Sequence, residues 1–321
     1  MTDSSKDMLA AARFIKEIGR GKDGARSLVR DDARLLYSAM LDGRVSDLEL
    51  GAILLAMRVK GESVEEIGGF LEAAEASFTP LEAPSGSYAP VVLPSYNGSR
   101  HMPNLTPLLA LLLARQGVPV LMHGVTHDPQ RITSAEIFTA LDMPHANDAA
   151  QAEALMRSGL PAFIPIAQLA PKMARLLDIR RVLGVRNSTH TLVKIMQPFA
   201  QPALRLTSYT HPEYLAMLTQ YFLTSAPAAR GDAFLMRGTE GETVANARRA
   251  QQIDWLHDAQ RTLLVEKQSV AEELTDLPEG RDAVATACWI AEVLQGHRAA
   301  PQAIVEQVEH CCAASARIAG R

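Results

Sequence analysis

The fold is decided by residues 91–122, whose sequence is VVLPSYNGSRHMPNLTPLLALLLARQGVPVLM. The apolar residues 91–93 predict a short buried strand, because consecutive apolar side chains leave no exposed face. A polar loop over residues 94–103 leads into a helix, for which Thr106 is the expected cap. A second strand is predicted over residues 118–122. A strand, a loop, a helix and a strand in this order predict a parallel sheet.

The segment before this unit, residues 1–79, is predicted to be a small helical domain. Apolar residues recur there at helical spacing in three stretches. Ser46 with Glu49, and Ser63 with Glu66, match the capping-box pattern at the start of a helix. No strand pattern occurs in this segment, so its fold class differs from that of the rest of the chain.

The predicted domain division follows from a change in sequence pattern between these two regions. Residues 80–90 contain three prolines and a glycine, which predict a linker between a helical domain (1–79) and an α/β domain (91–321). The further strand candidates in the α/β domain are residues 162–165, 203–206 and 233–236. The expected fold class is therefore α/β, with a small N-terminal helical domain and a larger domain around a mostly parallel central sheet.

Composition excludes several classes of protein. The 321 residues carry a formal net charge of −4, which excludes a uniformly basic protein. Three cysteines, Cys288, Cys311 and Cys312, are too few for a disulfide framework, and the N-terminus is polar, so we expect a cytoplasmic protein. The longest apolar run ends at Arg115 after ten residues, so no membrane partner is expected.

The charge is distributed unevenly along the chain. Residues 171–249 hold eleven Lys or Arg against five Asp or Glu, a balance of +6 within an acidic protein. Two interpretations remain open: one anion-binding face, or a scatter of solvated charges.

The first candidate anion site is the loop that follows the strand at residues 91–93. In open α/β sheets, ligands bind at the carboxyl ends of strands, where N–H groups at the start of the next helix favour anions. Gly98 allows close backbone approach, Ser99 can donate a hydrogen bond and Arg100 supplies charge. The alternative is a solvated turn, since Asn97-Gly98 is a common turn dipeptide.

The second candidate site is a cluster of cations and polar residues. It comprises Arg180, Arg181, Arg186, Asn187, His190 and Lys194. Arginines beside short polar side chains are typical of phosphate sites. A charged helix end with its cap is the alternative interpretation.

No metal site and no catalytic residue can be assigned from spacing. His123 and His127 are four residues apart, but no carboxylate lies between them as in a zinc-binding helix.

Two stretches, residues 42–47 and 51–67, together with His123-Gly124 and the run at 183–186, resemble glycosyltransferase family 3. This family includes anthranilate phosphoribosyltransferase, and the resemblance covers roughly residues 10 to 250. It implies a helical domain that forms a homodimer and a larger α/β domain. In active members it further implies that phosphoribosyl diphosphate binds between the domains.

The departures from the family pattern concern its phosphate and metal motifs. Counted back from Asn104, the family's G-T-G-G-D loop is here residues 94–98, PSYNG. The family's K-H-G-N-R is here MHGVT at 122–126, and its serine-rich run becomes RITS at 131–134. Its paired magnesium carboxylates fall at Glu242-Thr243, where one is lost. No cofactor is therefore certain, and magnesium is expected only if transferase activity remains.

The replacements are similar to those of a divergent bacterial branch, of which some members bind nucleic acid on a dimer. The resemblance implies a protein that binds phosphate-rich ligands, including nucleic acid. The residues expected to bind phosphate are Asn97, Gly98, Ser99, Arg100, Asn104, His123, Gly124, Arg131, Arg180, Arg181, Arg186, Asn187, His190 and Lys194. The alternatives are an active phosphoribosyltransferase with an unknown acceptor, and a dimeric scaffold without a ligand.

Overall fold

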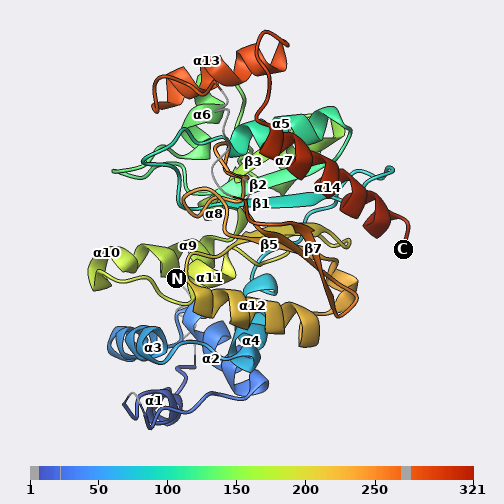
Figure 1. Cartoon of the computed structure of the whole chain (residues 1–321). Coiled ribbons are helices and arrows are strands. Elements are labelled where there is room, and N and C mark those ends of the chain that lie inside the picture. Colours follow the sequence, from blue (N-terminus) through green and yellow to red (C-terminus); the bar gives the residue numbers. More distant parts are fainter. Residues whose placement is uncertain (1–6, 22, 250, 269–275) are drawn as a thin grey trace. The chain divides into compact units, whose positions relative to one another are not determined.

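The computed structural model describes residues 7–21, 23–249, 251–268 and 276–321. The chain divides into two units, whose elements are labelled in Figure 1. The smaller unit comprises the chain up to Thr79 together with Ala170–Met196, and the larger unit comprises Pro80–Leu169 and Gln197–Arg321.

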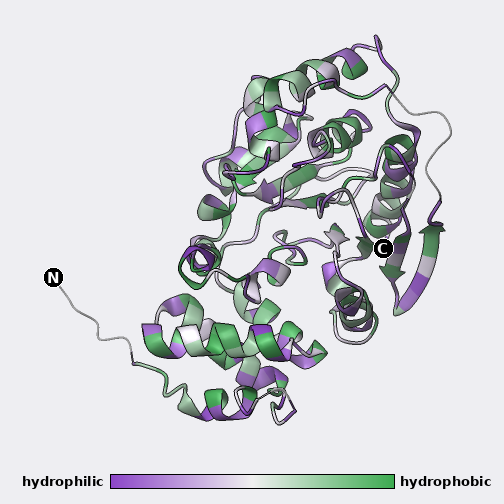
Figure 2. Cartoon of the chain, turned by 60° about the vertical axis from the view of Figure 1, so that its left-hand side comes forward, coloured by the Kyte–Doolittle hydropathy of each residue, from purple (hydrophilic) through white to green (hydrophobic). Residues whose placement is uncertain are grey.

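The smaller unit is helical. Its helices are α1 (Ala12–Ile18), α2 (Arg30–Asp42), α3 (Asp47–Lys60), α4 (Val64–Glu75), α9 (Pro171–Asp178), α10 (Arg180–Leu183) and α11 (Thr189–Leu192). Both predicted capping boxes are confirmed: Ser46 caps α3 with Glu49, and Ser63 caps α4 with Glu66. Figure 2 shows hydrophobic and hydrophilic residues alternating along these helices, as their amphipathic spacing predicts.

The division into units differs from the predicted one at residues 170–196 and at the predicted linker. Residues 170–196 were expected in the α/β domain, but α9 contacts α2 and α11 contacts α4. The buried hydroxyls of Tyr37 and Thr189 are hydrogen-bonded at 2.8 Å, and Arg175 Nη2 donates to the carbonyl oxygen of Met40 at 2.6 Å. These side-chain contacts, which span more than a hundred residues of sequence, explain why the segment groups with the helices.

The predicted linker, residues 80–90, is part of the larger unit. Leu81 is fully buried, and its N–H donates to the carbonyl oxygen of Pro198 at 2.9 Å. The segment is therefore fixed by backbone hydrogen bonds within that unit.

The larger unit is built on one seven-stranded sheet of order β3-β2-β1-β4-β5-β6-β7. Its strands are β1 (Val91–Ser95), β2 (Val120–Gly124), β3 (Ala162–Pro165), β4 (Leu204–Ser208), β5 (Ala233–Met236), β6 (Ile253–His257) and β7 (Gln260–Val265). β1 to β5 pair in parallel, as the sequence predicts. β6 and β7 add an antiparallel edge, which the sequence analysis did not predict.

The strand order places the loop after β1 at a topological switch point. The chain leaves β1 towards β2 on one side, while β4 pairs with β1 on the other side. At such a point the loops of neighbouring strands diverge, and open α/β sheets bind ligands in the crevice that results.

Helices cover both faces of this sheet (Figure 1). They are α5 (Thr106–Arg115), α6 (Ser134–Ala140), α7 (Ala149–Arg157), α8 (Ile166–Leu169), α12 (Pro212–Thr224), the short 3-10 helix η1 (Ala228–Arg230), α13 (Ala283–Leu294) and α14 (Gln302–Ala319). α5 contacts α6 and α14, whereas α12 contacts β5 and β6. Thr106 was expected to cap α5, but it is the first residue of the helix and its hydroxyl donates to Asn104 Oδ1 at 2.8 Å. In the part of the chain that the structure describes, no helix combines the length and hydropathy needed to cross a membrane.

Candidate functional site

The loop after β1 is fastened to a second loop at residues 131–132. The N–H of Ser99 donates to the carbonyl oxygen of Ile132 at 3.0 Å, and the N–H of Ile132 donates back at 2.9 Å. Gly98 has a φ of +64°, and a Cβ there would lie 2.6 Å from the carbonyl oxygen of Ile132. Gly98 is therefore required for the approach of two backbone segments, whereas the sequence suggested the approach of a ligand.

A carboxylate of the chain itself accepts hydrogen bonds from two successive N–H groups of this loop. Glu242 Oε1 accepts from Asn97 N at 2.8 Å and from Gly98 N at 2.7 Å. Its second oxygen lies 3.5 Å from the hydroxyl of Thr106, at the start of α5, and the residue is fully buried. The carboxylate of Glu242 thus lies where the loop after β1 and the first residue of α5 direct their hydrogen-bond donors, a place that favours anions.

The residues around Glu242 do not fit the magnesium site that the resemblance implies. Magnesium prefers several oxygen ligands, carboxylates among them. Here Oε1 of Glu242 already accepts two N–H groups, and the adjacent Thr243 has no carboxylate. Among the described residues there is no group of three or more His, Cys, Asp or Glu that could hold a metal ion.

A second carboxylate accepts hydrogen bonds from three further N–H groups of the loop, those after Ser99. Glu240 Oε2 accepts from Arg100 N, and Glu240 Oε1 accepts from His101 N and Met102 N, each at 2.8 Å. Arg131 Nη1 lies 3.8 Å from Glu240 Oε2 and also donates to the carbonyl oxygen of Gly98 at 3.3 Å. The side chain of Glu240 remains 16% exposed, so this carboxylate, unlike that of Glu242, faces solvent in part.

Asn104, a predicted phosphate ligand, is engaged in internal hydrogen bonds. Its Nδ2 donates to Ser134 Oγ at 3.1 Å and to the carbonyl oxygen of Ile132 at 3.3 Å. Its Oδ1 accepts from the N–H and the hydroxyl of Thr106. Ser134 Oγ in turn accepts from Ser95 Oγ at 2.8 Å. A buried polar network therefore holds both ends of the loop after β1, at Ser95 and at Asn104.

Tyr96 and His123 form a hydrogen-bonded pair beside the loop. The Tyr96 hydroxyl and His123 Nδ1 are 2.6 Å apart. Burial lowers the pKa of His123 to about 3 and raises the pKa of Tyr96, so both groups are neutral and His123 Nδ1 accepts a hydrogen bond from the Tyr96 hydroxyl. Among the described residues, buried His123 Nε2 has no hydrogen-bond partner. The next residue, Gly124, lies so close to Ser95 that a Cβ would overlap its carbonyl oxygen, so His123 and Gly124 are both positioned by packing.

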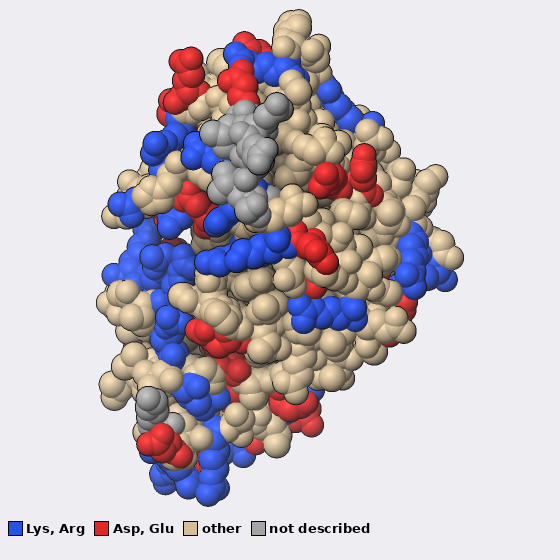
Figure 3. Space-filling model, viewed as in Figure 1, with Lys and Arg blue, Asp and Glu red and all other residues tan. Residues whose placement is uncertain are grey.

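The second predicted cluster lies in the smaller unit and centres on His190. The pKa of His190 is lowered to about 3, first by burial and then by the charges of Arg186 and Arg180, with a smaller contribution from Lys194. The charges of these three cations therefore act on one imidazole. His190 Nδ1 lies 3.2 Å from Asn187 N and 3.3 Å from Asn187 Oδ1, so both contacts join the ring to the same residue. Figure 3 shows Lys and Arg gathered at the left-hand margin, where Figure 1 labels α9 and α10.

Two members of the predicted cluster have other partners. The amide of Asn187 donates to the carbonyl oxygen of Leu176 at 2.8 Å and accepts from Thr189 N at 3.0 Å, so it fixes the turn before α11. The exposed Arg181 forms an ion pair with Asp178, three residues earlier, in which Arg181 Nε lies 3.6 Å from Asp178 Oδ1.

The structure thus divides the predicted phosphate-binding residues into two sets, one in each unit. The larger unit holds Asn97, Gly98, Ser99, Arg100, Asn104, His123, Gly124 and Arg131, and the smaller unit holds Arg180, Arg181, Arg186, Asn187, His190 and Lys194. Sequence reasoning missed Tyr96 as the partner of His123, and it missed Glu240. The sequence signal for Glu240 is its place beside Glu242 in the glycine-rich stretch Gly238-Thr239-Glu240-Gly241-Glu242.

Comparison with known proteins identifies relatives for both units. Residues 12–77 match the family model described as the glycosyl transferase family helical bundle domain. An Escherichia coli K12 protein, described as uncharacterized protein YbiB, is 43% identical over 309 residues, which cover 96% of this chain and 95% of the relative. The anthranilate phosphoribosyltransferase of Novosphingobium aromaticivorans is 28% identical over 68% of this chain and 64% of that protein.

Solved structures show the same fold. The crystal structure of anthranilate phosphoribosyltransferase from Thermus thermophilus aligns with 95% of this chain, and the aligned region is 89% of that protein. The TM-score is 0.73 and the sequence identity is 21%. The Saccharomyces cerevisiae enzyme in complex with PRPP and Mg covers 98% of both chains, with a TM-score of 0.63 and 13% identity. At these identities the likeness concerns the fold alone.

Proposed function

The chain belongs to the anthranilate phosphoribosyltransferase-like family, and from this premise we propose that it binds phosphate-rich ligands, nucleic acid among them, instead of transferring phosphoribosyl groups. One observation carries the proposal. Five backbone N–H groups of the loop after β1 donate to the carboxylates of Glu240 and Glu242. A backbone N–H has one proton to donate, so donors bound to a carboxylate do not also bind a diphosphate.

Electrostatics point in the same direction. The two carboxylates add negative charge where a diphosphate in the transferase would need positive charge or magnesium. Glu242 is fully buried, so its charge is screened by solvent far less than a surface charge. A diphosphate approaching this loop would be repelled rather than held.

The cations near His190 support the second half of the proposal. Arg180, Arg186 and Lys194 all act on one imidazole, and all three belong to the smaller unit. Guanidinium and ammonium groups gathered in this way suit a chain of phosphates, which contributes most of the affinity in nucleic-acid binding.

The test is a fluorescence-anisotropy titration with single-stranded DNA across a salt series. Each phosphate contact contributes about 0.7 to the slope of log affinity against log salt, so Arg186→Ala with Lys194→Ala should lower the slope by about 1.4. Arg115→Ala with Arg157→Ala is the control, because it removes the same charge from exposed positions of the larger unit. Absence of binding at low salt, or equal slopes for both double variants, would contradict the proposal.

We also propose that the chain forms a homodimer through its helical unit. α3 buries Leu50, Ile53 and Leu54 on one side, yet Leu55 and Val59 on another side are 51% and 65% exposed. A helix that is apolar on two sides generally buries both.

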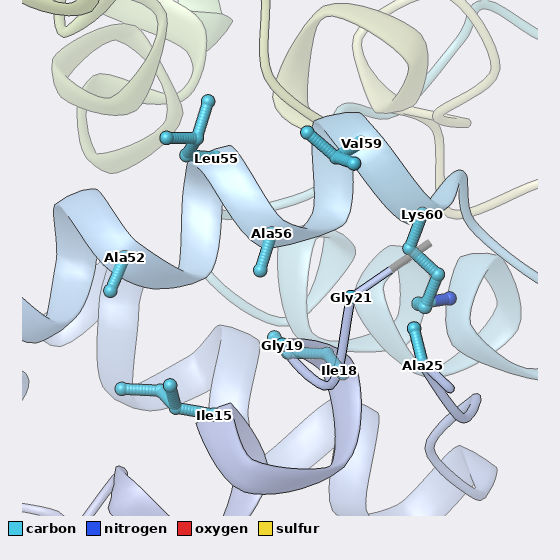
Figure 4. Close-up of a pocket in the computed structure, with 10 residues that line it drawn as sticks. All are labelled: Ile15, Ile18, Gly19, Gly21, Ala25, Ala52, Leu55, Ala56, Val59 and Lys60. Atoms are coloured by element: carbon cyan, nitrogen blue, oxygen red, sulfur yellow. The ribbon is translucent and has the colours of Figure 1, made fainter. Parts of the chain in front are cut away.

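These exposed residues border a groove between α1 and α3. The groove has a volume of about 380 Å³, and Figure 4 shows Ile15 on its α1 side and Ala52, Leu55 and Val59 on its α3 side. Light scattering coupled to size exclusion should give the mass of two chains, and Leu55→Asp with Val59→Asp should give that of one. Leu263→Asp, at another exposed apolar position, is the control and should leave the dimer intact.

A transferase that uses phosphoribosyl diphosphate is the second candidate. The observation that favours it is the shared fold with the yeast enzyme that was solved with PRPP and Mg. In this alternative Arg100 and Arg131 of the larger unit would hold the diphosphate in place of glycine N–H groups. Magnesium-dependent binding of phosphoribosyl diphosphate in calorimetry would support it.

A further inference from the structure

We infer that a small pocket in the smaller unit binds a free α-amino acid with a short side chain, with Arg34 at its carboxylate and Glu72 at its ammonium group. The inference does not rest on the proposed nucleic-acid binding, since none of the cations near His190 lines this pocket. The pocket has a volume of about 180 Å³. Its lining comes from α2, from the end of α4 and from Lys172 at the start of α9, all within the smaller unit.

Small side chains on α4 leave the space for this pocket. A Cβ at Gly69 would overlap the carbonyl oxygen of Arg30, so the glycine lets α4 pack closely on α2. Further along, α4 and its C-cap line the pocket with Ala73 and Ala76, which are too small to fill the space beside the longer side chains of α2. At about 30 Å³ for each water in the liquid, the pocket holds about six waters, or a solute of about that many non-hydrogen atoms. This size fits the smallest amino acids.

Two opposite charges lie side by side in the lining without a close contact. Arg34 Nε lies 3.9 Å from Glu72 Oε2, and Arg34 Nη2 lies 3.5 Å from Asp31 Oδ1. Glu72 Oε1, by contrast, accepts from Arg30 Nε at 2.8 Å, which fixes the position of the carboxylate. The side chains of Arg34 and Glu72 are 54% and 41% exposed, so a ligand reaches both from solvent.

An α-amino acid matches the spacing of these two groups. The lengths of its N–Cα, Cα–C and C–O bonds place the ammonium nitrogen about 3 Å from a carboxylate oxygen. Charge-assisted hydrogen bonds are about 2.8 Å long, so the ligand can lie alongside the 3.9 Å pair and bond to both members at once. A ligand with a single charge would satisfy one member and lie close to the like charge of the other.

The far end of the pocket is balanced in charge. Arg34, Ser38 and Asp42 are four residues apart on one face of α2, which places Asp42 about 12 Å beyond Arg34. Lys172 Nζ donates to Asp42 Oδ1 at 2.7 Å, so these two lining residues compensate each other. No net charge is therefore available there for an acidic or basic ligand side chain.

Two serines favour a ligand with a hydroxyl side chain. Ser38 and Ser77 both line the pocket. Ser77 Oγ donates its proton to the carbonyl oxygen of Ala74 at 2.6 Å, so the oxygen is left to accept from a ligand. L-Serine supplies such a donor together with the two charges and is therefore the probe of choice.

The experiment is an NMR titration of the isotope-labelled full chain with L-serine at low salt. We expect saturable shifts of amide signals in α2 and α4, with a Kd of about 1 mM or tighter. Two probes of similar shape each lack one charge: L-serinamide has no carboxylate, and glycerate has a hydroxyl in place of the ammonium group. Each should bind at least about tenfold more weakly. L-Phenylalanine keeps both charges but exceeds the volume of the pocket, so it should not bind.

Variants locate the binding in this pocket. Arg34→Gln and Glu72→Gln should each weaken L-serine at least about tenfold. Arg26→Gln and Glu65→Gln are the matched controls, because they remove the same charges from exposed positions of the smaller unit outside the pocket, and they should leave the Kd within about twofold. Ala76→Phe fills the space without changing any charge and should abolish binding.

Thermal melting establishes that each variant is folded. If Glu72→Gln does not fold because Arg30 loses its partner, Arg34→Gln and Ala76→Phe carry the test. No saturable shift with L-serine up to about 20 mM overturns the inference, as does unchanged affinity in the folded Ala76→Phe variant. Glycerate that binds as tightly as L-serine would show a plain anion site and would also overturn it. None of these results bears on the DNA titration, which depends on Arg186 and Lys194.

Discussion

Replacing Glu242 with alanine should destabilise the larger unit more than any single change within the loop after β1, which Glu242 holds in place. Glu242 Oε1 accepts the N–H groups of Asn97 and Gly98 at 2.8 and 2.7 Å in a fully buried place. Leaving a buried donor unsatisfied costs about 1–3 kcal/mol, so two donors give about 4 kcal/mol. At about 2–4 °C for each kcal/mol, the melting temperature should fall by about 8–16 °C.

The assay is urea unfolding followed by tryptophan fluorescence. Both tryptophans of the chain, Trp255 on β6 and Trp289 on α13, belong to the larger unit, so their signal reports that unit. Glu242→Gln keeps an acceptor oxygen and should lose only about 1–2 kcal/mol, while Glu309→Ala on an exposed helix face should lose less than about 0.5 kcal/mol. If Glu242→Ala stays within about 0.5 kcal/mol of the unmodified chain, the carboxylate does not hold the loop as described.

Three other single-residue changes test separate parts of the structure. Gly98→Ala should cost more than about 1 kcal/mol in the same assay, because φ is +64° and the Cβ would lie 2.6 Å from a carbonyl oxygen, whereas Gly86→Ala meets no atom within 4 Å and should be neutral. The pKa of His123 is lowered to about 3, so between about pH 6.5 and pH 3 the imidazole of His123 is protonated only in the unfolded chain. The free energy of unfolding should therefore fall by up to about 1.4 kcal/mol for each pH unit below ~6.5. His123→Gln should flatten that decline. A pH profile identical in both proteins would contradict this assignment. Tyr37→Phe removes the hydrogen bond to Thr189 and should speed amide exchange in α11 by about tenfold, and unchanged exchange would show that the bond does not hold this segment to the helical unit.

Local chemistry was sufficient to predict much of the fold. The capping boxes at Ser46 and Ser63 depend on residues three apart, and both helices begin where these pairs predict. The parallel strands were predictable from short apolar runs separated by helical patterns. β7 was missed because its residues are mostly exposed and do not alternate, so its hairpin with β6 leaves a weak pattern.

The parts of the site that could not be predicted depend on long-range contacts. Glu240 and Arg100 are 140 residues apart in sequence, and no spacing rule connects them. The place of residues 170–196 in the helical unit likewise depends on contacts such as that between Tyr37 and Thr189. By contrast, the location of the loop after β1 at the carboxyl end of a parallel strand follows from strand order, which the sequence does indicate.

The most direct test of the central claim is a paired calorimetric titration of one sample. Phosphoribosyl diphosphate with magnesium is the first ligand, and single-stranded DNA at low salt is the second. Because Glu240 and Glu242 occupy the N–H groups of the loop after β1, we expect no saturable heat from phosphoribosyl diphosphate, with or without magnesium, and salt-sensitive binding of the DNA. Tight, magnesium-dependent binding of phosphoribosyl diphosphate, with no response to DNA, would contradict the account.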